Sequence, residues 1–324
     1  MIAFMFPGQG SQAAGMGKDW AEGSLVASEY FERANQALGR DLRKICFEGP
    51  EAELTDTRNT QPALYTVSCI AARLLFDRGL ISDYVLGHSI GEYAALYFAR
   101  SYDFETGLRL VQKRAEVMAE AASSKPGAMA AVIRFDPARI ESICREVSEA
   151  EGLPLSVAGF NSPEQTVISG TKEMVEKASA VLKAEGAKRV VTLNVSGAFH
   201  SALMSEAQGA FQKVVEATPL RKPSTLFLSN HDARPATDVE TLKLHLPRQL
   251  TSPVRWTDSL KFLKEQGCQA YVEVGPGTVL GGLLSKFDPE APCAQLSDLA
   301  SFDTAVERFK PCLCGLRPQE DDLT

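Results

Sequence analysis

A serine between two glycines is the first residue of the sequence that could do chemistry. Gly87-His88-Ser89-Ile90-Gly91 fits the G-x-S-x-G pattern, in which a strained strand-to-helix turn exposes the serine hydroxyl as a nucleophile. The pattern lies between the apolar run Tyr84-Val85-Leu86 and a helical pattern at residues 90–99, as such a turn requires. Three fixed positions also occur by chance, and a glycine-rich turn with Ser89 as an ordinary helix N-cap is the alternative. We interpret Ser89 as a candidate nucleophile.

A serine nucleophile needs a base to take its proton, and the four histidines of the sequence are the candidates. His88 is a poor candidate because successive residues in a tight turn point apart. His245 lies in a polar helical stretch where we expect it to be solvated, and His231 resembles a turn residue. His200 follows a strand predicted at Arg189–Leu193, so it could face a cleft. Elimination favours His200 as the base, although a lone histidine is more often structural than catalytic.

Arg114 stands in an amphipathic helix predicted to run from Asp103, its N-cap, to Ala122. At about 100° per residue, Arg114 lies at the edge of the apolar stripe of this helix. A guanidinium beside apolar neighbours either extends to water or meets a fixed anion. The first is the plain interpretation, and the second makes Arg114 a bidentate clamp for a substrate carboxylate. The stripe consists of Phe104, Leu108, Val111, Ala115 and Met118.

A second glycine-containing turn, Gly8-Gln9-Gly10-Ser11-Gln12, follows a strand predicted at Ile2–Phe6. It does not match the G-x-x-x-x-G-K-[ST] pattern of a nucleotide-binding loop. Its backbone N–H groups could form half of an oxyanion hole, with the N–H of Ile90 as the other half. The plain alternative is a tight turn that requires flexible residues.

The elements around these residues indicate an α/β fold. Short buried strands are predicted at Ile2–Phe6, Tyr84–Leu86 and Ala270–Val274. Helical patterns lie between them, including an amphipathic one at Thr60–Leu75 with an interruption expected at Gln61-Pro62. Strand–turn–helix succession of this kind is typical of a mainly parallel sheet covered by helices.

The stretch from residue 127 to 194 has a different pattern. Its predicted order is strand, helix, strand, strand, helix, strand, the βαββαβ unit of a ferredoxin-like domain. We therefore predict a small domain at 127–194 inserted into a large catalytic domain that comprises 1–126 and 195–286. A cleft between two domains is a preferred place for a ligand site. Residues 287–324 contain several prolines and end in an acidic run, so we predict a loosely packed C-terminal tail.

Composition excludes several other classes of protein. The 324 residues carry a net charge of −7, so no basic excess exists to bind nucleic acid. The seven cysteines are an odd number and mostly scattered, which favours reduced thiols in a cytoplasmic protein. Cys312-Leu313-Cys314 could suggest a metal site, but no histidine or further cysteine pair lies nearby, and we expect no metal. No apolar segment is long enough for a signal peptide or a membrane span, so we expect no membrane association.

Five motifs, in order along the chain, resemble those of the malonyl-CoA:acyl-carrier-protein transacylase family, which includes the acyltransferases of fatty acid and polyketide synthesis. One such motif would be a weak signal, but five in the family's order and approximate spacing are specific. The resemblance runs from residue 1 to about 285 and implies a hydrolase-like α/β large domain with the small ferredoxin-like domain inserted. The motifs are Phe6-Pro7-Gly8-Gln9-Gly10-Ser11-Gln12, Gly87-His88-Ser89-Ile90-Gly91-Glu92, Gln112-Lys113-Arg114 with Met118, Gly197-Ala198-Phe199-His200, and Glu273-Val274-Gly275-Pro276-Gly277.

The resemblance implies catalytic roles for the matching residues. Ser89 would attack the thioester of malonyl-CoA, and His200 would take its proton. The backbone carbonyl of Gln249 would orient His200, and the N–H groups of Gln9 and Ile90 would hold the oxyanion. Coenzyme A would then leave, and the phosphopantetheine thiol of an acyl carrier protein would take the malonyl group from Ser89. This is a ping-pong S-malonyltransferase mechanism that requires no metal or redox cofactor.

The resemblance also implies how the substrate is selected. Arg114 would pair with the free malonyl carboxylate. This pairing would keep extender units apart from simple acyl groups, because a buried guanidinium left unpaired is unstable. Phe199 is the residue that the family uses for malonyl substrates, since its ring crowds the space of a 2-methyl branch. The other pocket residues implied by the match are Met118, His88, Gln61 and Asn161.

Some positions depart from the family pattern. Tyr97-Phe98-Ala99-Arg100-Ser101-Tyr102 stands where small alanine or glycine residues often follow the helix after the active serine. Ala202 stands where larger residues or proline are common. Residues 102–108 and the extended tail are closer to discrete polyketide acyltransferases that act in trans. The family is often monomeric, and we expect a monomer.

Two other functions fit part of the pattern. An acyl hydrolase would pass the acyl group from Ser89 to water and so clear stalled acyl groups from carrier proteins, but a fixed carboxylate partner such as Arg114 has no use there. A catalytically silent subunit would hold a synthase together through its acidic surface. Malonyl transfer is the interpretation that uses Ser89, His200 and Arg114 together.

Overall fold

The computed structural model of the chain describes residues 1–313. In this part, none of the helices combines the length and the apolar character needed to cross a membrane. The elements are, in order, β1 (Ile2–Phe6), α1 (Lys18–Gly23), α2 (Leu25–Leu38), α3 (Leu42–Glu48), α4 (Glu51–Thr55), α5 (Thr57–Asp77), β2 (Tyr84–Gly87), α6 (Gly91–Phe98), α7 (Phe104–Ser124), β3 (Ala128–Ile133), α8 (Pro137–Glu151), β4 (Leu155–Ser162), β5 (Gln165–Gly170), α9 (Lys172–Ala184), β6 (Arg189–Thr192), the short 3-10 helix η1 (Ala202–Met204), α10 (Ser205–Ala217), β7 (Leu226–Leu228), β8 (Pro235–Ala236), α11 (Val239–Arg248), α12 (Trp256–Glu265), β9 (Ala270–Val274), α13 (Val279–Phe287), β10 (Cys293–Leu296) and α14 (Leu299–Leu313).

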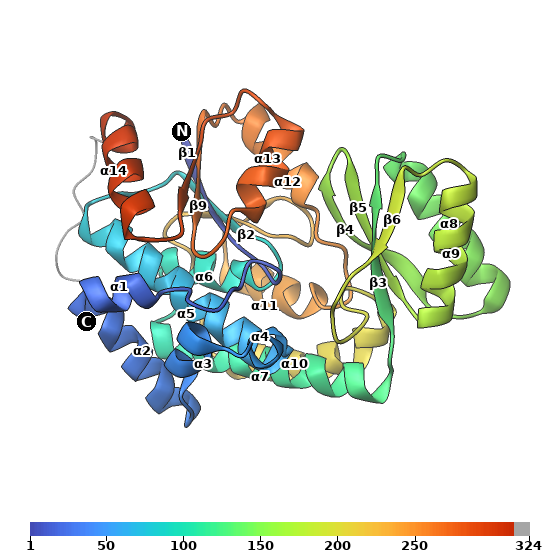
Figure 1. Cartoon of the computed structure of the whole chain (residues 1–324), viewed down its shortest axis with the longest axis horizontal. Coiled ribbons are helices and arrows are strands. Elements are labelled where there is room, and N and C mark those ends of the chain that lie inside the picture. Colours follow the sequence, from blue (N-terminus) through green and yellow to red (C-terminus); the bar gives the residue numbers. More distant parts are fainter. Residues whose placement is uncertain (314–324) are drawn as a thin grey trace.

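A mainly parallel sheet forms the centre of the larger part of the molecule (Figure 1). Its order is β10-β9-β1-β2-β7-β8, and only the short β8 runs antiparallel to its neighbour. All five residues of β1 are buried, as a strand covered on both faces requires. Phe4 and Phe6 pack into the larger core on one face, and Ala3 and Met5 pack on the other face with α12 and α13. This arrangement confirms the predicted α/β fold with a mainly parallel sheet.

The register between β1 and β2 brings the two glycine-containing turns together. Phe6 is paired with Gly87, so both strands end at the same level of the sheet. The turn at residues 8–12 and the turn around Ser89 therefore leave the same edge of the sheet side by side. The carboxyl ends of parallel strands are the usual place for a site in an open α/β sheet.

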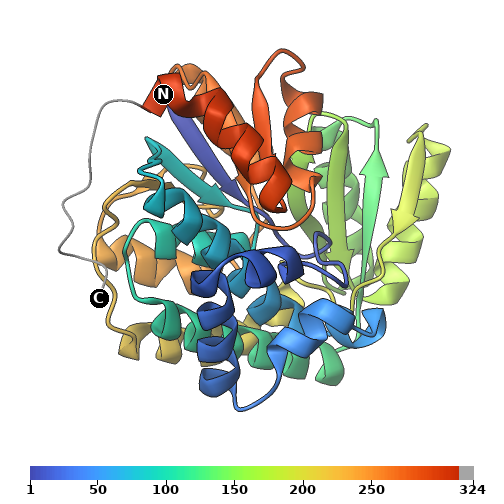
Figure 2. The same cartoon turned by 60° about the vertical axis from the view of Figure 1, so that its left-hand side comes forward.

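A second, antiparallel sheet has the order β4-β5-β3-β6 (Figures 1 and 2). Strand alternation gives it two different faces. Ala130 and Val132 pack under α8 and α9, whereas Met129 and Ala131 belong to the core shared with the large sheet. The order of elements from Ala128 to Thr192 is the expected βαββαβ. The division into domains at 127 and 194 stays a prediction.

Helix α5 continues through Pro62, where the sequence predicts an interruption. A proline within a helix leaves the carbonyl four residues earlier without its N–H donor. That carbonyl belongs to Arg58, and it accepts a hydrogen bond from Nη2 of Arg40 at 2.6 Å instead. The replacement donor explains why the helix tolerates this proline.

Helix α7 begins as the sequence predicts. Asp103 is its N-cap, and Oδ1 of Asp103 accepts a hydrogen bond from the N–H of Thr106 at 2.8 Å. The helix packs against α5 and α10 and then delivers the chain to β3 in the small sheet. Arg114 lies in the middle of this helix and is one of its buried residues.

The prediction of a loose tail from residue 287 is wrong for the part of the tail that the structure describes. Strand β10 pairs with β9 in parallel and extends the large sheet. Three residues of α14, Phe302, Ala305 and Val306, are buried in the main core. An edge strand and one apolar helix face are enough to hold the segment in spite of its prolines. Cys314 and the acidic run at 320–322 lie outside the described residues.

Candidate active site

The turn between β2 and α6 holds Ser89 in a strained conformation. Ser89 has a φ of 52°, in the left-handed region that residues with side chains rarely adopt. Two glycines make room for the turn: a Cβ on Gly87 would overlap the backbone of Gly91, and a Cβ on Gly91 would overlap the carbonyl of Phe6. The strand–turn–helix context that the sequence predicts is therefore present, and it directs the hydroxyl of Ser89 into a cavity.

His200 is the histidine that meets Ser89. Its Nε2 lies 2.8 Å from Oγ of Ser89, and its Nδ1 lies 2.8 Å from the carbonyl oxygen of Gln249 and 3.2 Å from that of Ser252. A carbonyl oxygen can only accept, so Nδ1 carries the proton and Nε2 presents its lone pair to the serine hydroxyl. Burial and the nearby positive charge of Arg114 lower the pKa of His200 to about 3. His200 is thus a neutral proton acceptor at ordinary pH.

The other three histidines do not contact Ser89. Nε2 of His88 lies 2.9 Å from Oδ1 of Asn161, which fixes its ring at the wall of the cavity. His231 and His245 pack against each other with ring centroids 4.8 Å apart. The prediction that His245 is solvated is wrong, because its side chain is only 12% exposed and its Nδ1 lies 3.2 Å from Oγ of Ser229.

Arg114 is buried, with 1% exposure, so the interpretation that its side chain extends to water is wrong. Its Nη1 donates to Oε1 of Gln61 at 2.7 Å. Its Nη2 donates to Oε1 of Gln249 at 2.8 Å and to Oγ of Ser89 at 3.1 Å. These partners are all neutral, and burial lowers the pKa of the guanidinium. A buried cation held only by neutral oxygens is a strong attractor for an anion at the same place.

One cavity of about 300 Å³ brings most of the expected site residues together. Its wall comes in part from the small sheet, with Met129 and Val167, and in part from the turn between β2 and α6, with Ile90. Gln61 is placed behind this wall, where its Nε2 donates to Sδ of Met118 at 3.5 Å. The expected site residues that line the cavity are Gln9, His88, Ser89, Ile90, Arg114, Met118, Asn161, Phe199 and His200.

Gln9 and Ile90 both line this cavity. Within residues 1–313, neither N–H has a hydrogen-bond acceptor. Two unsatisfied backbone donors beside a nucleophile are the arrangement that an oxyanion requires.

Glu92 and Asn230 belong to the site as well, although the sequence analysis gave neither a role. Asn230 ties the turn together: its Oδ1 accepts from the N–H of Ser89 at 2.8 Å, and its Nδ2 donates to the carbonyl of Gly87 at 2.7 Å. Glu92 accepts from the N–H of Asn230 at 2.5 Å through Oε1 and from Nε2 of Gln249 through Oε2. A signal for Glu92 exists, because it is the only acidic or basic residue from Ser89 to Phe98. Nothing in the sequence around Asn230 indicates its role.

Glu92 sets the orientation of the Gln249 side chain. The amide of Gln249 donates to Glu92 and to the carbonyl of Ser89 at 3.0 Å, so its oxygen must face Arg114. Burial raises the pKa of Glu92 to about 8, and the hydrogen bonds and the charge of Arg114 oppose this rise. Gln249 therefore has two roles in the site. Its backbone carbonyl accepts a hydrogen bond from His200, and its side-chain oxygen accepts one from Arg114.

The fifth motif lies outside the cavity. The carboxylate of Glu273 accepts hydrogen bonds from the N–H groups of Leu280 and Gly281, at 2.9 and 2.8 Å, and so holds the first turn of α13. Gly275 has a φ of 130° and packs closely against Pro7 and Ser68. This motif therefore supports the turn that follows β1.

Comparisons with known proteins agree with this geometry. A family model described as acyl transferase domain matches residues 3–287. A malonyl CoA-acyl carrier protein transacylase of Bacillus subtilis is 39% identical over 309 residues, which cover 95% of this chain and 97% of the relative. A protein of the same name from Synechocystis is 43% identical over 302 residues, with 92% and 99% covered.

Solved structures show the same similarity over nearly the whole chain. One is a malonyl-transacylase in complex with the holo acyl-carrier protein of a type II PKS, with a TM-score of 0.92, 40% identity, and coverage of 95% of this chain and 99% of that one. Another is a malonyl CoA-acyl carrier protein transacylase from Coxiella burnetii, with a TM-score of 0.92, 36% identity, and coverage of 95% and 97%.

Proposed function

Because the chain belongs to the acyl transferase family, we propose that it moves a malonyl group from malonyl-CoA, through an acyl-serine intermediate, to the phosphopantetheine thiol of an acyl carrier protein. The observation that carries this proposal is the meeting of Ser89, His200 and Arg114 through Oγ of Ser89, which lies 2.8 Å from the imidazole and 3.1 Å from the guanidinium. A nucleophile with its base on one side and a buried cation on the other suits an acyl group that ends in a carboxylate.

The first half-reaction loads Ser89. Oγ of Ser89 attacks the thioester carbonyl carbon of malonyl-CoA while its proton passes to Nε2 of His200. The N–H groups of Gln9 and Ile90 hold the oxyanion of the tetrahedral intermediate. When the C–S bond breaks, His200 returns the proton to the leaving sulfur, so coenzyme A departs as a neutral thiol. Malonyl-Ser89 remains as an ester.

The second half-reaction reverses these steps with a different thiol. The phosphopantetheine thiol of the carrier protein loses its proton to His200 and attacks the ester carbonyl. The intermediate collapses, the proton returns to Oγ of Ser89, and the malonyl thioester of the carrier protein leaves. Gln249 supports both halves, because its carbonyl oxygen keeps the proton of His200 on Nδ1 at 2.8 Å.

Arg114 selects for the malonyl group. In the proposed complex, the free carboxylate of the malonyl group accepts a bidentate pair of hydrogen bonds from the guanidinium. Gln61 and Gln249 hold the guanidinium plane in position at 2.7 and 2.8 Å. Phe199, which is 5% exposed, limits the room beside the acyl carbon, and Met118, His88 and Asn161 form the remaining wall.

An acyl hydrolase is the alternative that shares the acyl-serine step. The two functions are separated by incubating the protein with malonyl-CoA, adding a holo carrier protein, and following malonyl-carrier and free malonate over time. We expect malonyl-carrier to form much faster than malonate. Malonate formed as fast as malonyl-carrier would contradict the transferase function, and the Ser89→Ala variant measures the uncatalysed background of both.

We further propose a cytoplasmic monomer that serves fatty acid or polyketide synthesis. The relatives named above are malonyl CoA-acyl carrier protein transacylases, and one solved relative is in complex with a carrier protein of a type II PKS. Light scattering on the purified protein tests the monomer: a mass near 35.1 kDa is expected, and twice that mass would contradict it.

A further inference from the structure

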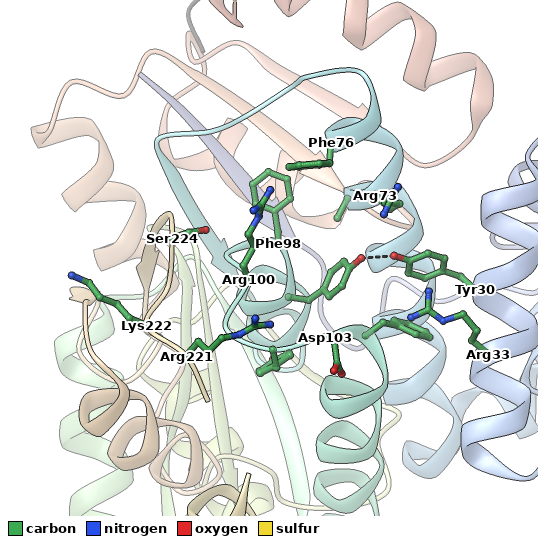
Figure 3. A pocket seen from close by; sticks show the side chains of 14 residues that line it. Tyr30, Arg33, Arg73, Phe76, Phe98, Arg100, Asp103, Arg221, Lys222 and Ser224 are labelled. Carbon is green, nitrogen blue, oxygen red and sulfur yellow. Dashed lines mark hydrogen bonds between the residues drawn. The ribbon is translucent and has the colours of Figure 1, made fainter. Parts of the chain in front are cut away.

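Helix α6 follows the strained turn of Ser89, and its far end is held by aromatic side chains. The ring of Phe98 packs edge-on against Phe4 with centroids 5.3 Å apart, and the hydroxyl of Tyr97 is hydrogen-bonded to that of Tyr30. Figure 3 shows this end, with Tyr30 and Phe98 labelled, and the cavity of about 420 Å³ beside it. The eight residues of α6 put about 12 Å between its ends, so this packing does not reach the turn that holds Ser89.

Strand β7 borders β2 but ends before this turn. The parallel register pairs Leu86 with Leu228, which is the last residue of β7. The N–H of Ser229 then donates to the carbonyl of Arg234 at 3.0 Å, because the chain turns back toward β8. The backbone of β7 therefore stops short of the residues that lead into the turn.

The side-chain amide of Asn230 continues the ladder where the backbone of β7 leaves it. Its Nδ2 donates to the carbonyl of Gly87 at 2.7 Å, and its Oδ1 accepts from the N–H of Ser89 at 2.8 Å. In a parallel ladder, one residue donates its N–H and offers its C=O to the two residues that flank the residue opposite. Gly87 and Ser89 flank His88, so the amide takes the place of a β7 residue opposite His88.

Asn230 is itself held on several sides. It is fully buried, with 0% exposure. Its N–H donates to Oε1 of Glu92, and its carbonyl accepts from the N–H of Arg255 at 3.2 Å. The orientation of its amide is also fixed, because the carbonyl of Gly87 can only accept and the N–H of Ser89 can only donate. The amide is therefore a rigid support for the two backbone groups that it contacts.

Ser89 needs this support because its φ of 52° is strained. Such a conformation persists only where the surrounding structure determines it strongly. On the β1 side, the N–H of His88 donates to the carbonyl of Phe6 at 3.0 Å. On the β7 side, Asn230 provides the only hydrogen-bond acceptor that the N–H of Ser89 has within residues 1–313.

We propose that Asn230 is a positioning residue for the acyl transfer, an inference that rests on the proposed function. Its amide keeps Ser89 in the conformation in which Oγ lies 2.8 Å from Nε2 of His200. Without the amide, two buried backbone groups lose their partners, and the backbone of Ser89 relaxes away from the left-handed region. The hydroxyl then moves away from its base, and a displacement of about 1 Å can slow a reaction by about a hundredfold.

A change of the Asn230 side chain leaves the contacts of Arg114 in place. The hydrogen bond to Glu92 comes from the backbone N–H of Asn230, so only proline would remove it. Glu92 still accepts from the amide of Gln249, and that amide still accepts from Arg114. A positioning role therefore predicts a lower rate at saturating substrate with little change in KM, and the same loss for malonyl-CoA and acetyl-CoA.

The rate at which Ser89 is modified, followed by intact-protein mass spectrometry on the full-length protein, tests this role. The probes are malonyl-CoA and phenylmethylsulfonyl fluoride, which forms a sulfonyl ester with an activated serine and releases fluoride and the serine proton. In Asn230→Ala, both rates are expected to fall by about tenfold to a hundredfold, while modification still goes to completion and KM for malonyl-CoA changes by less than about twofold. A wild-type rate with a reduced final extent would indicate a partly unfolded protein and would overturn the proposal.

The second probe separates this proposal from the proposed function. A wild-type protein that reacts with phenylmethylsulfonyl fluoride but not with malonyl-CoA would contradict malonyl transfer. The sulfonyl fluoride rates of the wild type and Asn230→Ala would still decide whether Asn230 positions Ser89.

Asn35→Ala is the matched control. Oδ1 of Asn35 also accepts from a backbone N–H group, that of Leu42 at 2.8 Å, but neither of these residues lines the cavity at Ser89. This variant is expected to lose thermal stability and to keep the wild-type rates with both probes. Equal rates for Asn230→Ala and Asn35→Ala would overturn the positioning role.

Asn230→Asp tests the hydrogen bond to Gly87 separately, because it replaces only the NH₂ group. An ionised carboxylate accepts from the N–H of Ser89 but cannot donate to the carbonyl of Gly87. The protonated carboxyl can do both, and burial beside Glu92 favours its protonation. The sulfonyl fluoride rate of this variant, divided by the wild-type rate at the same pH, is therefore expected to rise by about tenfold from pH 8 to pH 6. A ratio that does not rise would overturn the proposal.

Discussion

His200 is a base whose charge is set by its burial. Its folded pKa of about 3 lies below its ordinary value of 6.5, so the folded protein binds fewer protons than the unfolded chain between these pH values. His200 therefore contributes stability above pH 6.5 that is lost as the pH falls toward 3. The same shift keeps the imidazole neutral, and able to accept the proton of Ser89, well below pH 6.5.

We predict that loading of Ser89 by malonyl-CoA loses little rate between pH 7 and about pH 5. An ordinary histidine would be mostly protonated at the lower value, and the rate would fall by more than tenfold. The measurement is the second-order rate of adduct formation at low malonyl-CoA concentration, with circular dichroism at each pH to show that the protein is folded. A half-maximal rate near pH 6.5 would show that burial does not govern this histidine.

Arg114 is expected to decide which acyl group is accepted. In Arg114→Ala, loading with malonyl-CoA should fall by about a hundredfold or more, because two charge-assisted hydrogen bonds are lost. Loading with acetyl-CoA should survive or improve, because the unpaired buried cation is gone. Arg109→Ala, an exposed arginine of the same helix, is the control. Equal losses for both substrates would rule out the carboxylate clamp.

At this scale the sequence pointed to the right side chains but not to their surroundings. The pattern around Ser89 and the elimination among four histidines were enough to pair Ser89 with His200, which lie 2.8 Å apart. Helical periodicity put Arg114 at the edge of an apolar stripe but could not decide between solvent and burial, because that depends on what α5 and residue 249 place against it. Long-range contacts of this kind have no local signal.

Helix α6 positions the site through Glu92, and the turn before it positions Ser89. Glu92 forces the amide oxygen of Gln249 toward Arg114, since both oxygens of Glu92 accept from N–H groups. In Glu92→Gln, the introduced NH₂ group would face the NH₂ group of Gln249. The amide of Gln249 would then rotate and present a donor to the guanidinium, which is already a donor.

We predict that, above pH 8, where Glu92 of the wild-type protein is ionised, Glu92→Gln raises KM for malonyl-CoA by about tenfold, because Arg114 loses one of its fixed acceptors. Loading by acetyl-CoA should change less, since no carboxylate needs Arg114 there. Steady-state kinetics with both substrates make the measurement, and Glu240→Gln on the surface of α11 is the control. If the variant lost thermal stability while KM stayed the same, Glu92 would be a structural residue only.

Among the elements, those with a clear period were predicted well. The strand predicted at Ala128–Ile133 is present as β3, and the apolar stripe predicted for α7 lies on its buried face. Helix α5 was predicted to break at Pro62, because the donor that compensates for the missing N–H comes from Arg40, in a different part of the chain. The pairing of β1 with β2, which aligns Phe6 with Gly87, also depends on the whole sheet.

At the scale of the whole molecule, the segment after residue 287 is part of the fold. Its prolines suggested a loose tail, but proline affects only the local backbone. Phe302 is 2% exposed, and the core that its ring joins is built mainly from the first half of the chain. Strand β10 adds an edge to β9, and α14 packs beside it.

We predict that Phe302→Ala lowers the free energy of unfolding by about 3–5 kcal/mol, as expected for a buried phenylalanine. Asp303→Ala, whose side chain is 73% exposed, should change it by less than about 0.5 kcal/mol. Urea denaturation of the two variants makes the comparison. Similar urea denaturation midpoints for the two variants would indicate that the segment is a loosely packed tail.

In the proposed mechanism, the whole enzyme carries the malonyl group as an ester of Ser89 between its two substrates. Intact-protein mass spectrometry after brief incubation with malonyl-CoA measures this directly. We predict one malonyl group on the wild-type protein, its loss when a holo carrier protein is added, and no adduct on Ser89→Ala. A wild-type protein without an adduct, or a Ser89→Ala protein with one, would contradict the mechanism.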